Sequence, residues 1–176
     1  MIPLPFSIIL LLTAATTLLT SGQLQAAQVE RIELHQLQSV QIKHQRRGGN
    51  VRAQAQRQGW IVRVPQLYVY LSDYSPVFHM DGYRSTLLRD LSIRVDRSRT
   101  ERTTIRLDRL LENTETLETA EPFTQNDLPP ADLYIVFYNR PDCEDCDRVR
   151  ADLDSWLEER ESLNVVWLDV TMDLVL

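Results

Sequence analysis

Hydrophobic residues form their clearest pattern in the last third of the sequence. Residues 132–138 (DLYIVFY) and 164–170 (NVVWLDV) are apolar runs of strand length, typical of strands covered on both faces in a parallel or mixed sheet. Between them an apolar stripe recurs at helical spacing: Val149, Leu153, Trp156 and Leu157. The pattern predicts a helix over residues 143–161, and therefore one strand–helix–strand unit of an α/β fold.

A second β-rich region lies nearer the middle of the chain. Residues 60–71 (WIVRVPQLYVYL) combine branched and aromatic residues. Pro65 lies at the head of the second piece, and a proline suits a strand start because it lacks an amide donor. Residues 72–76 (SDYSP) predict a turn. They are followed by a predicted second strand over residues 77–83 and a short helix over residues 84–91.

Elsewhere the patterns are weaker. Residues 91–95 favour a strand, and apolar residues near helical spacing favour a helix over residues 104–118. Residues 121–131 contain three prolines and predict a loop. Residues 28–60 are rich in glutamine, and their apolar positions fit either a strand or an amphipathic helix.

The N-terminal residues, 1–27, have the composition of a targeting segment. An apolar run over residues 6–19 precedes the small pair Ala26 and Ala27, and Glu30 is the first charged side chain. This favours an export signal that is cleaved. An uncleaved membrane anchor is the alternative, since about 20 apolar residues can span a bilayer. Either interpretation predicts a periplasmic or other extracytoplasmic location, where two cysteines can form a disulfide.

Composition is that of an ordinary globular protein, with 43% hydrophobic and 25% charged residues, but the charge is uneven. Residues 28–63 have seven bases and two acids, whereas residues 120–176 have four bases and fourteen acids. The basic segment has no recognisable nucleic-acid motif, so we expect no nucleic acid. It can instead dock on the acidic half of its own chain, remain solvated, or contact another envelope protein.

The two cysteines, Cys143 and Cys146, lie two residues apart between the predicted strand and helix. A helix N-terminus favours the thiolate form of the first cysteine, and the second is close enough to resolve a mixed disulfide. A structural disulfide across so short a loop would constrain the unfolded chain little. A zinc site needs four ligands, and no histidine has ligand spacing to the pair. The sequence therefore favours a redox pair with no metal and no bound cofactor.

These motifs resemble the thioredoxin superfamily, in its thioredoxin-like and glutaredoxin-like branches. The resemblance covers the strand end, the Pro–Asp before the first cysteine, the CxxC, the long helix and the LDVT strand. It implies that Cys143 attacks and Cys146 resolves. Such domains also need a cis-proline loop, a β-hairpin and a last helix, but no proline follows Pro141. Residues 62–91 resemble that half, with Pro65 as the candidate cis-proline.

The resemblance therefore implies one thioredoxin-like domain over residues 61–176 with its halves in permuted order, and with residues 91–95 and 104–118 as the first strand and helix. Two incomplete units and a truncated product are the alternatives. Four acids surround the cysteines: Asp142, Glu144, Asp145 and Asp147. They disfavour a thiolate, so we predict a weak oxidant that exchanges with protein thiols and disulfides. A non-catalytic envelope binding or assembly protein and a metal carrier are the competing functions.

Overall fold

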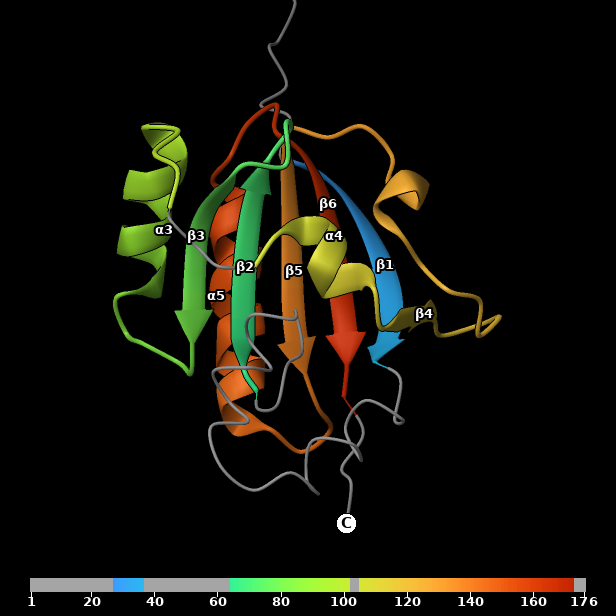
Figure 1. Ribbon diagram of the computed structural model, residues 1–176. Coiled ribbons are helices and arrows are strands. Elements are labelled where there is room, and N and C mark those ends of the chain that lie inside the picture. Colours follow the sequence, from blue (N-terminus) through green and yellow to red (C-terminus); the bar gives the residue numbers. More distant parts are fainter. Residues whose placement is uncertain (1–26, 37–63, 102–104, 173–176) are drawn as a thin grey trace, which may run out of the picture.

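The computed structural model describes residues 27–36, 64–101 and 105–172, and these ranges form one six-stranded sheet with helices on both faces (Figure 1). The strands are β1 (Gln28–Gln36), β2 (Gln66–Leu71), β3 (Pro76–Asp81), β4 (Thr114–Thr116), β5 (Leu133–Asn139) and β6 (Asn164–Thr171). The helices are α3 (Leu87–Asp96), α4 (Leu107–Leu111) and α5 (Glu144–Glu158), with a 3-10 turn η1 (Gln125–Asp127). Within the same ranges, no helix has the length and apolar character needed to cross a bilayer.

The strands follow the order β3-β2-β5-β6-β1-β4 across the sheet. β5 and β6 are parallel neighbours at its centre, and β1 continues the parallel part beside β6. β2 runs antiparallel to β5, and β3 and β4 are antiparallel strands at the two edges. The sheet is therefore mixed, as the sequence predicts, and β5, α5 and β6 form the predicted strand–helix–strand unit.

Apolar side chains fill both faces of the sheet. On one face, Leu67, Ile135, Phe137 and Trp167 pack against buried residues of α5 and α3. On the other face, tyrosines and aliphatic residues of the central strands pack against α4. All seven residues of β5 are buried, which explains why its sequence is apolar without alternation.

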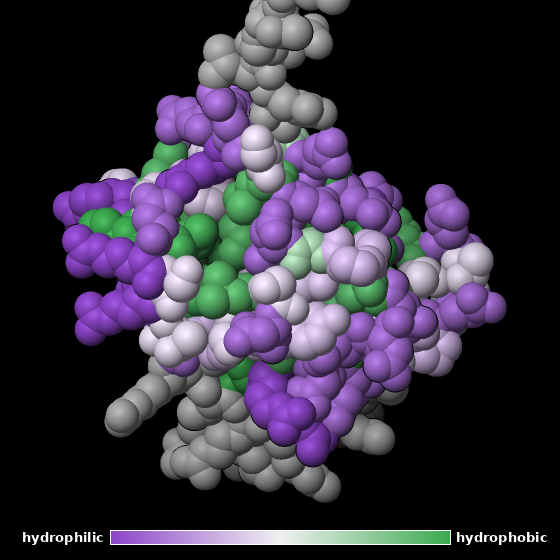
Figure 2. Space-filling view, turned by 90° about the horizontal axis from the view of Figure 1, so that it is seen from above, coloured by the Kyte–Doolittle hydropathy of each residue, from purple (hydrophilic) through white to green (hydrophobic). Residues whose placement is uncertain are grey.

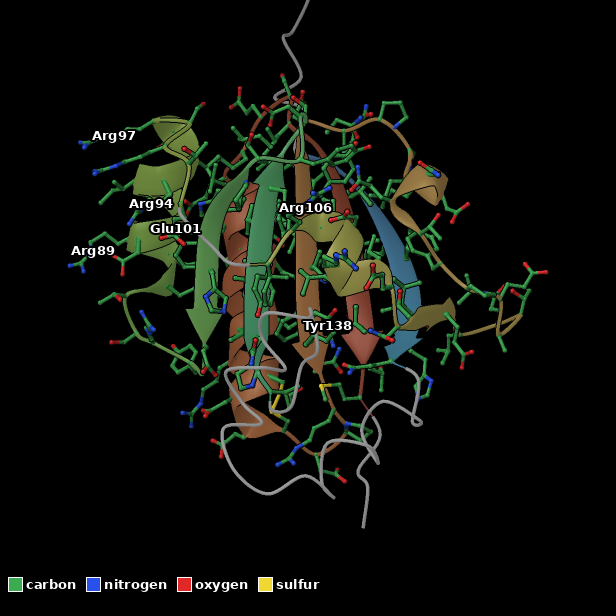
Figure 3. The ribbon with its side chains drawn as sticks, in the orientation of Figure 1. Arg89, Arg94, Arg97, Glu101, Arg106 and Tyr138 are labelled. Atoms are coloured by element: carbon green, nitrogen blue, oxygen red, sulfur yellow. A yellow bond between two sulfur atoms is a disulfide. The ribbon has the colours of Figure 1, made fainter. Side chains whose placement is uncertain are left out.

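Buried tyrosines of the α4 face donate their hydroxyl groups to different hydrogen-bond partners. Tyr138, labelled in Figure 3, donates its hydroxyl to the carbonyl oxygen of Leu110 in α4. Tyr68 donates to the side-chain oxygen of Gln66 over 2.6 Å, and its ring stacks on His79 with centroids 4.4 Å apart. Polar tips on apolar rings thus fix how α4 and the β-hairpin sit on this face.

The β2–β3 hairpin confirms the predicted turn over residues 72–76. The backbone amides of Leu71 and Tyr74 donate to the carbonyl oxygens of Ser75 and Leu71, and Asp73 accepts from the amide and hydroxyl groups of Ser75. Tyr74 has a φ of 64°, the left-handed geometry that closes the turn. The predicted strand over residues 77–83 is β3, which ends at Asp81, directly before Gly82.

The strand predicted over residues 91–95 is wrong, because these residues are helical. The short helix predicted over residues 84–91 exists, but it begins at Leu87 and continues to Asp96 as α3. Leu87 and Leu91, four residues apart, are its buried residues, and they face the core shared with α5. Arg89 of α3 and Arg97, the residue that follows this helix, point away from the sheet (Figure 3).

The helix predicted over residues 104–118 is also largely wrong. Only α4 is helical in the described part of this range, and β4 follows it after a short turn. The hydroxyl of Thr114 donates to the carbonyl oxygen of Leu111, and β4 then pairs with β1. Leu117, which the helical pattern would bury, is 52% exposed. The apolar residues of α4 are nevertheless buried, so the pattern located a core segment but overestimated the helix.

The N-terminal pattern, ambiguous in the sequence, is a strand. β1 pairs with β6 over eight residues, and Leu34 is fully buried. Arg31 forms an ion pair with Asp154 of α5, so at this point the basic segment does dock on the acidic half of the chain. The predicted export signal and most of the basic segment lie outside the described residues.

At the end of the molecule where α5 runs into β6, hydrophilic side chains cover most of the surface (Figure 2).

Candidate functional site

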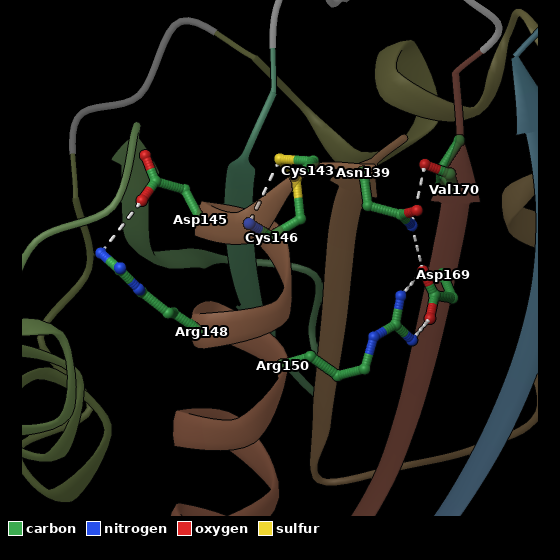
Figure 4. Close-up of a disulfide and its surroundings, with 8 residues drawn as sticks. All are labelled: Asn139, Cys143, Asp145, Cys146, Arg148, Arg150, Asp169 and Val170. Atoms are coloured by element: carbon green, nitrogen blue, oxygen red, sulfur yellow. Dashed lines mark hydrogen bonds and ion pairs between the residues drawn. A yellow bond between two sulfur atoms is a disulfide. The ribbon is translucent and has the colours of Figure 1, made fainter. Parts of the chain in front are cut away.

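Cys143 and Cys146 form a disulfide at the start of α5, with their sulfur atoms 2.10 Å apart (Figure 4). β5 ends at Asn139, and a three-residue connection that includes Asp142 with a φ of 56° leads to Cys143. Cys143 is the N-cap of α5. Its sulfur accepts from the amide of Cys146 over 3.2 Å, and its carbonyl accepts from the same amide and from that of Asp147. The strand–helix junction predicted from sequence is therefore where the pair lies.

The two cysteine residues differ in their exposure to solvent. Cys143 is partly exposed, whereas Cys146 is 2% exposed and belongs to the apolar core beneath α5. Thiol–disulfide exchange requires the attacking sulfur to reach its partner. Of the two residues, Cys143 is the more exposed, and its sulfur also accepts an amide hydrogen bond of the kind that stabilises a thiolate. This geometry fits the implied roles of attacking Cys143 and resolving Cys146.

All four acids near the pair are exposed, and one base offsets two of them. Arg148 forms ion pairs with Glu144 and, at 3.6 Å, with Asp145. Within the described ranges no ion pair involves Asp142 or Asp147. The uncompensated negative charge beside the sulfurs is therefore smaller than the count of four acids suggests, although it keeps the same sign.

Pro65 lies at the same end of the central strands as the disulfide. It precedes β2, whose first residue, Gln66, is opposite Tyr138 near the end of β5. Pro65 is buried, its carbonyl accepts from the amide of Gly82, and the Val64–Pro65 peptide bond is cis. Val64 and Cys143 both pack against the core cluster under α5. The segment around Pro65 and the segment with the cysteines therefore lie at one end of the central strands.

A polar cluster that sequence reasoning missed lies beside the disulfide. Asp169 of β6 accepts hydrogen bonds from the side-chain amide of Asn139 and from the guanidinium of Arg150 on α5 (Figure 4). Asn139 also donates to the carbonyl oxygen of Val170 over 3.4 Å. The cluster joins both central strands to the helix that carries the cysteines.

Burial dominates the electrostatics of this cluster. The Asp169 side chain is 12% exposed, and burial raises the pKa of its carboxyl above the ordinary value, while the hydrogen bond and charge of Arg150 oppose that rise. The guanidinium of Arg150 also lies 5.6 Å from the centre of the Phe137 ring. The sequence held one signal for this cluster: Asp169 is the single charged residue in the apolar run 164–170.

No metal site accompanies the disulfide in the part of the chain that the structure describes, since no three His, Cys, Asp or Glu side chains converge there. Comparison with known proteins identifies no relative: no family model, no curated protein and no solved structure matches the chain. The function is therefore argued from the site alone.

Proposed function

We propose that this protein is a thiol–disulfide oxidoreductase on a thioredoxin-like fold whose two halves occur in permuted order. The observation that carries this proposal is the pairing of a partly exposed Cys143 with a buried Cys146 at the N-terminus of α5. A disulfide that serves only to hold two neighbouring residues together stabilises little, because the loop it closes is short. Thiol–disulfide exchange explains this arrangement better than a structural role does.

The arrangement of the sheet supports the permuted fold. The cysteine half supplies β5, α5 and β6, and the hairpin half supplies β2, β3 and α3. β2 pairs directly with β5, and α3 packs on the same face as α5, so both halves share one sheet and one core. This favours a single permuted unit over two incomplete ones. The place that the first strand was expected to take from residues 91–95 is filled instead by β1, beside β6.

In the proposed reaction the reduced protein attacks a disulfide of a substrate protein. The Cys143 thiolate bonds to one substrate sulfur, the substrate disulfide breaks, and the released substrate thiolate takes up a proton. Cys146 then loses its proton and attacks the sulfur of Cys143, which releases the second substrate thiolate, also to be protonated. The substrate becomes a dithiol and the Cys143–Cys146 disulfide forms. A dithiol reductant, protein or small molecule, then returns two electrons and two protons.

The compartment and partners belong to the same proposal. The apolar N-terminal run supports export to the periplasm or another extracytoplasmic space, either free after cleavage or held by an uncleaved anchor. Protein thiols and disulfides are the proposed partners, and the basic segment over residues 28–63 is proposed to bind an envelope protein. The reaction needs no cofactor beyond the two cysteines.

The test is the dithiothreitol-driven reduction of a model protein disulfide. The purified protein should accelerate it, Cys143→Ser should remove the acceleration while the circular dichroism spectrum is kept, and Ser155→Ala, at an exposed position on α5, should match the parent. A parent no faster than the Cys143→Ala, Cys146→Ala double variant would overturn the proposal. In that case the non-catalytic binding role becomes the better interpretation.

A further inference from the structure

The cation nearest in sequence to Cys146 on the sheet side of α5 is already engaged. Arg150 follows Cys146 by four residues, and residues four apart on a helix are neighbours, with about 5–6 Å between their Cβ atoms. The guanidinium turns to β6, where two of its nitrogen atoms contact the two carboxylate oxygens of Asp169. Figure 4 shows this contact beside the disulfide rather than on it.

The carboxylate is itself held in place. Asp169 is opposite Phe137 in the β5–β6 register, so its side chain shares the α5 face of the sheet. Asn139, 6% exposed and the last residue of β5, donates its amide to the same carboxylate. A partly buried charged pair with these additional hydrogen bonds has little freedom to reorient. The position of the Arg150 guanidinium therefore depends on Asp169.

A free guanidinium one turn from the sulfurs would favour the thiolate form of the reduced pair, because an opposite charge lowers a thiol pKa. A more stable thiolate makes the reduced state more stable and the disulfide more oxidising. Pairing with Asp169 cancels most of that effect, since the two charges together appear nearly neutral to a third group. The four exposed acids then set the sign of the field at Cys143.

We propose that Asp169, oriented by Asn139, is a positioning residue that holds and neutralises Arg150, and so keeps the Cys143–Cys146 pair reducing. This inference rests on the proposed redox function. It assigns a role to three residues that lie outside the CxxC motif, and it makes the reduction potential of the pair depend on an ion pair between β6 and α5.

The experiment measures the equilibrium constant between the protein and reduced and oxidised dithiothreitol for a set of charge variants. Asp169→Asn keeps the size of the side chain and removes its charge, so at pH 9, where a thiol of ordinary pKa is largely thiolate, it should shift the equilibrium toward the reduced protein roughly tenfold, or about 30 mV for two electrons. Arg150→Gln leaves the buried carboxylate unpaired, and it should shift the equilibrium in the opposite direction. The double variant should lie between the two single variants.

Asp154→Asn is the matched control, because it removes a charge from the same helix but from an ion pair with Arg31. It should leave the equilibrium within about twofold of the parent, as expected for a half-exposed surface pair. An unchanged Asp169→Asn, or a double variant shifted as far as Asp169→Asn alone, would overturn the inference. If Asp169→Asn does not fold, an Arg150→Gln equilibrium equal to that of the parent overturns it alone.

The two proposals fail in different ways. A parent whose disulfide does not equilibrate with dithiothreitol at all contradicts the redox function itself. A parent that equilibrates normally, with variants that do not shift, contradicts only the role of Asp169.

Discussion

The guanidinium of Arg31 lies 4.1 Å from the centre of the Trp167 ring, which fixes the N-terminal strand against the centre of the sheet. The same guanidinium pairs with Asp154 of α5. β1 is thus held to β6 by its backbone ladder and to the helix layer by a side chain. A segment that sequence alone separated from the domain is a structural part of it.

The first prediction concerns this strand. Leu34→Ala should lower the free energy of unfolding by about 2–5 kcal/mol, because it leaves a cavity at a fully buried position. Urea denaturation followed by tryptophan fluorescence measures the change. Glu30→Gln, at an exposed position of the same strand, is the control and should stay within about 0.5 kcal/mol of the parent. A Leu34→Ala variant as stable as the control would show that β1 does not contribute to the core.

The second prediction concerns the order of attack. Cys146→Ser, incubated with oxidised glutathione, should accumulate a mixed disulfide at Cys143, because this partly exposed residue reacts and nothing resolves the product. Cys143→Ser should accumulate far less, since Cys146 is buried. Intact-protein mass spectrometry distinguishes the two. Equal adducts on both variants would contradict the assignment of Cys143 as the attacking residue.

The third prediction concerns the acids. Cys143 should not be strongly acidified, so alkylation against pH should give a thiol pKa that is not well below about 7. Asp142→Asn and Asp147→Asn remove the two acids that no described ion pair offsets, and each should speed alkylation at pH 7 about twofold through a modest electrostatic effect. Glu158→Gln, at the far end of α5, should not change the rate. A parent pKa far below 7 would contradict the expected weak oxidant.

The fourth prediction concerns pH. Burial lowers the pKa of His79, and within the described residues its Nε2 atom has no hydrogen-bond partner. The unfolded state therefore binds a proton more readily than the folded state, so this residue lowers stability as pH falls below about 6.5. His79→Phe keeps the stacking on Tyr68 and removes the titration. Urea midpoints of the variant should change less between pH 7.5 and pH 5 than those of the parent; a parallel change in both would contradict the prediction.

The strongest patterns in the sequence located the elements that carry the cysteines. β5 and β6 were predictable because they are largely buried and therefore have apolar runs, and α5 was predictable because its buried face has an apolar stripe. The helix over residues 104–118 was overestimated because Leu107, Leu110 and Leu111 are buried at helical spacing, whereas β4, shortly after them, pairs with β1. The order of turn, strand and helix there depends on β1, a partner about 80 residues away in sequence.

The site was predictable only where its residues are neighbours in sequence. Cys143 and Cys146 were predictable as a candidate redox pair from their CxxC spacing. Asp169 gave only a weak signal and Arg150 gave none, because a single acid in an apolar run and an arginine at an exposed-looking helix position are each common. Their relationship arises from the β5–β6 register and the placement of α5, which no local pattern contains.

The strand order has a consequence for synthesis. The two strands at the centre of the sheet, β5 and β6, are translated after all the other strands that the structure describes. Until they emerge, β1 lacks its neighbour β6 and β2 lacks its neighbour β5, and most of the pairings join distant segments, which slows folding. The cysteines lie between these last two strands. The folded site that holds the cysteines therefore forms only after the sheet is complete. A thiol or disulfide partner that reacts before then meets the cysteines on a chain that has not yet folded.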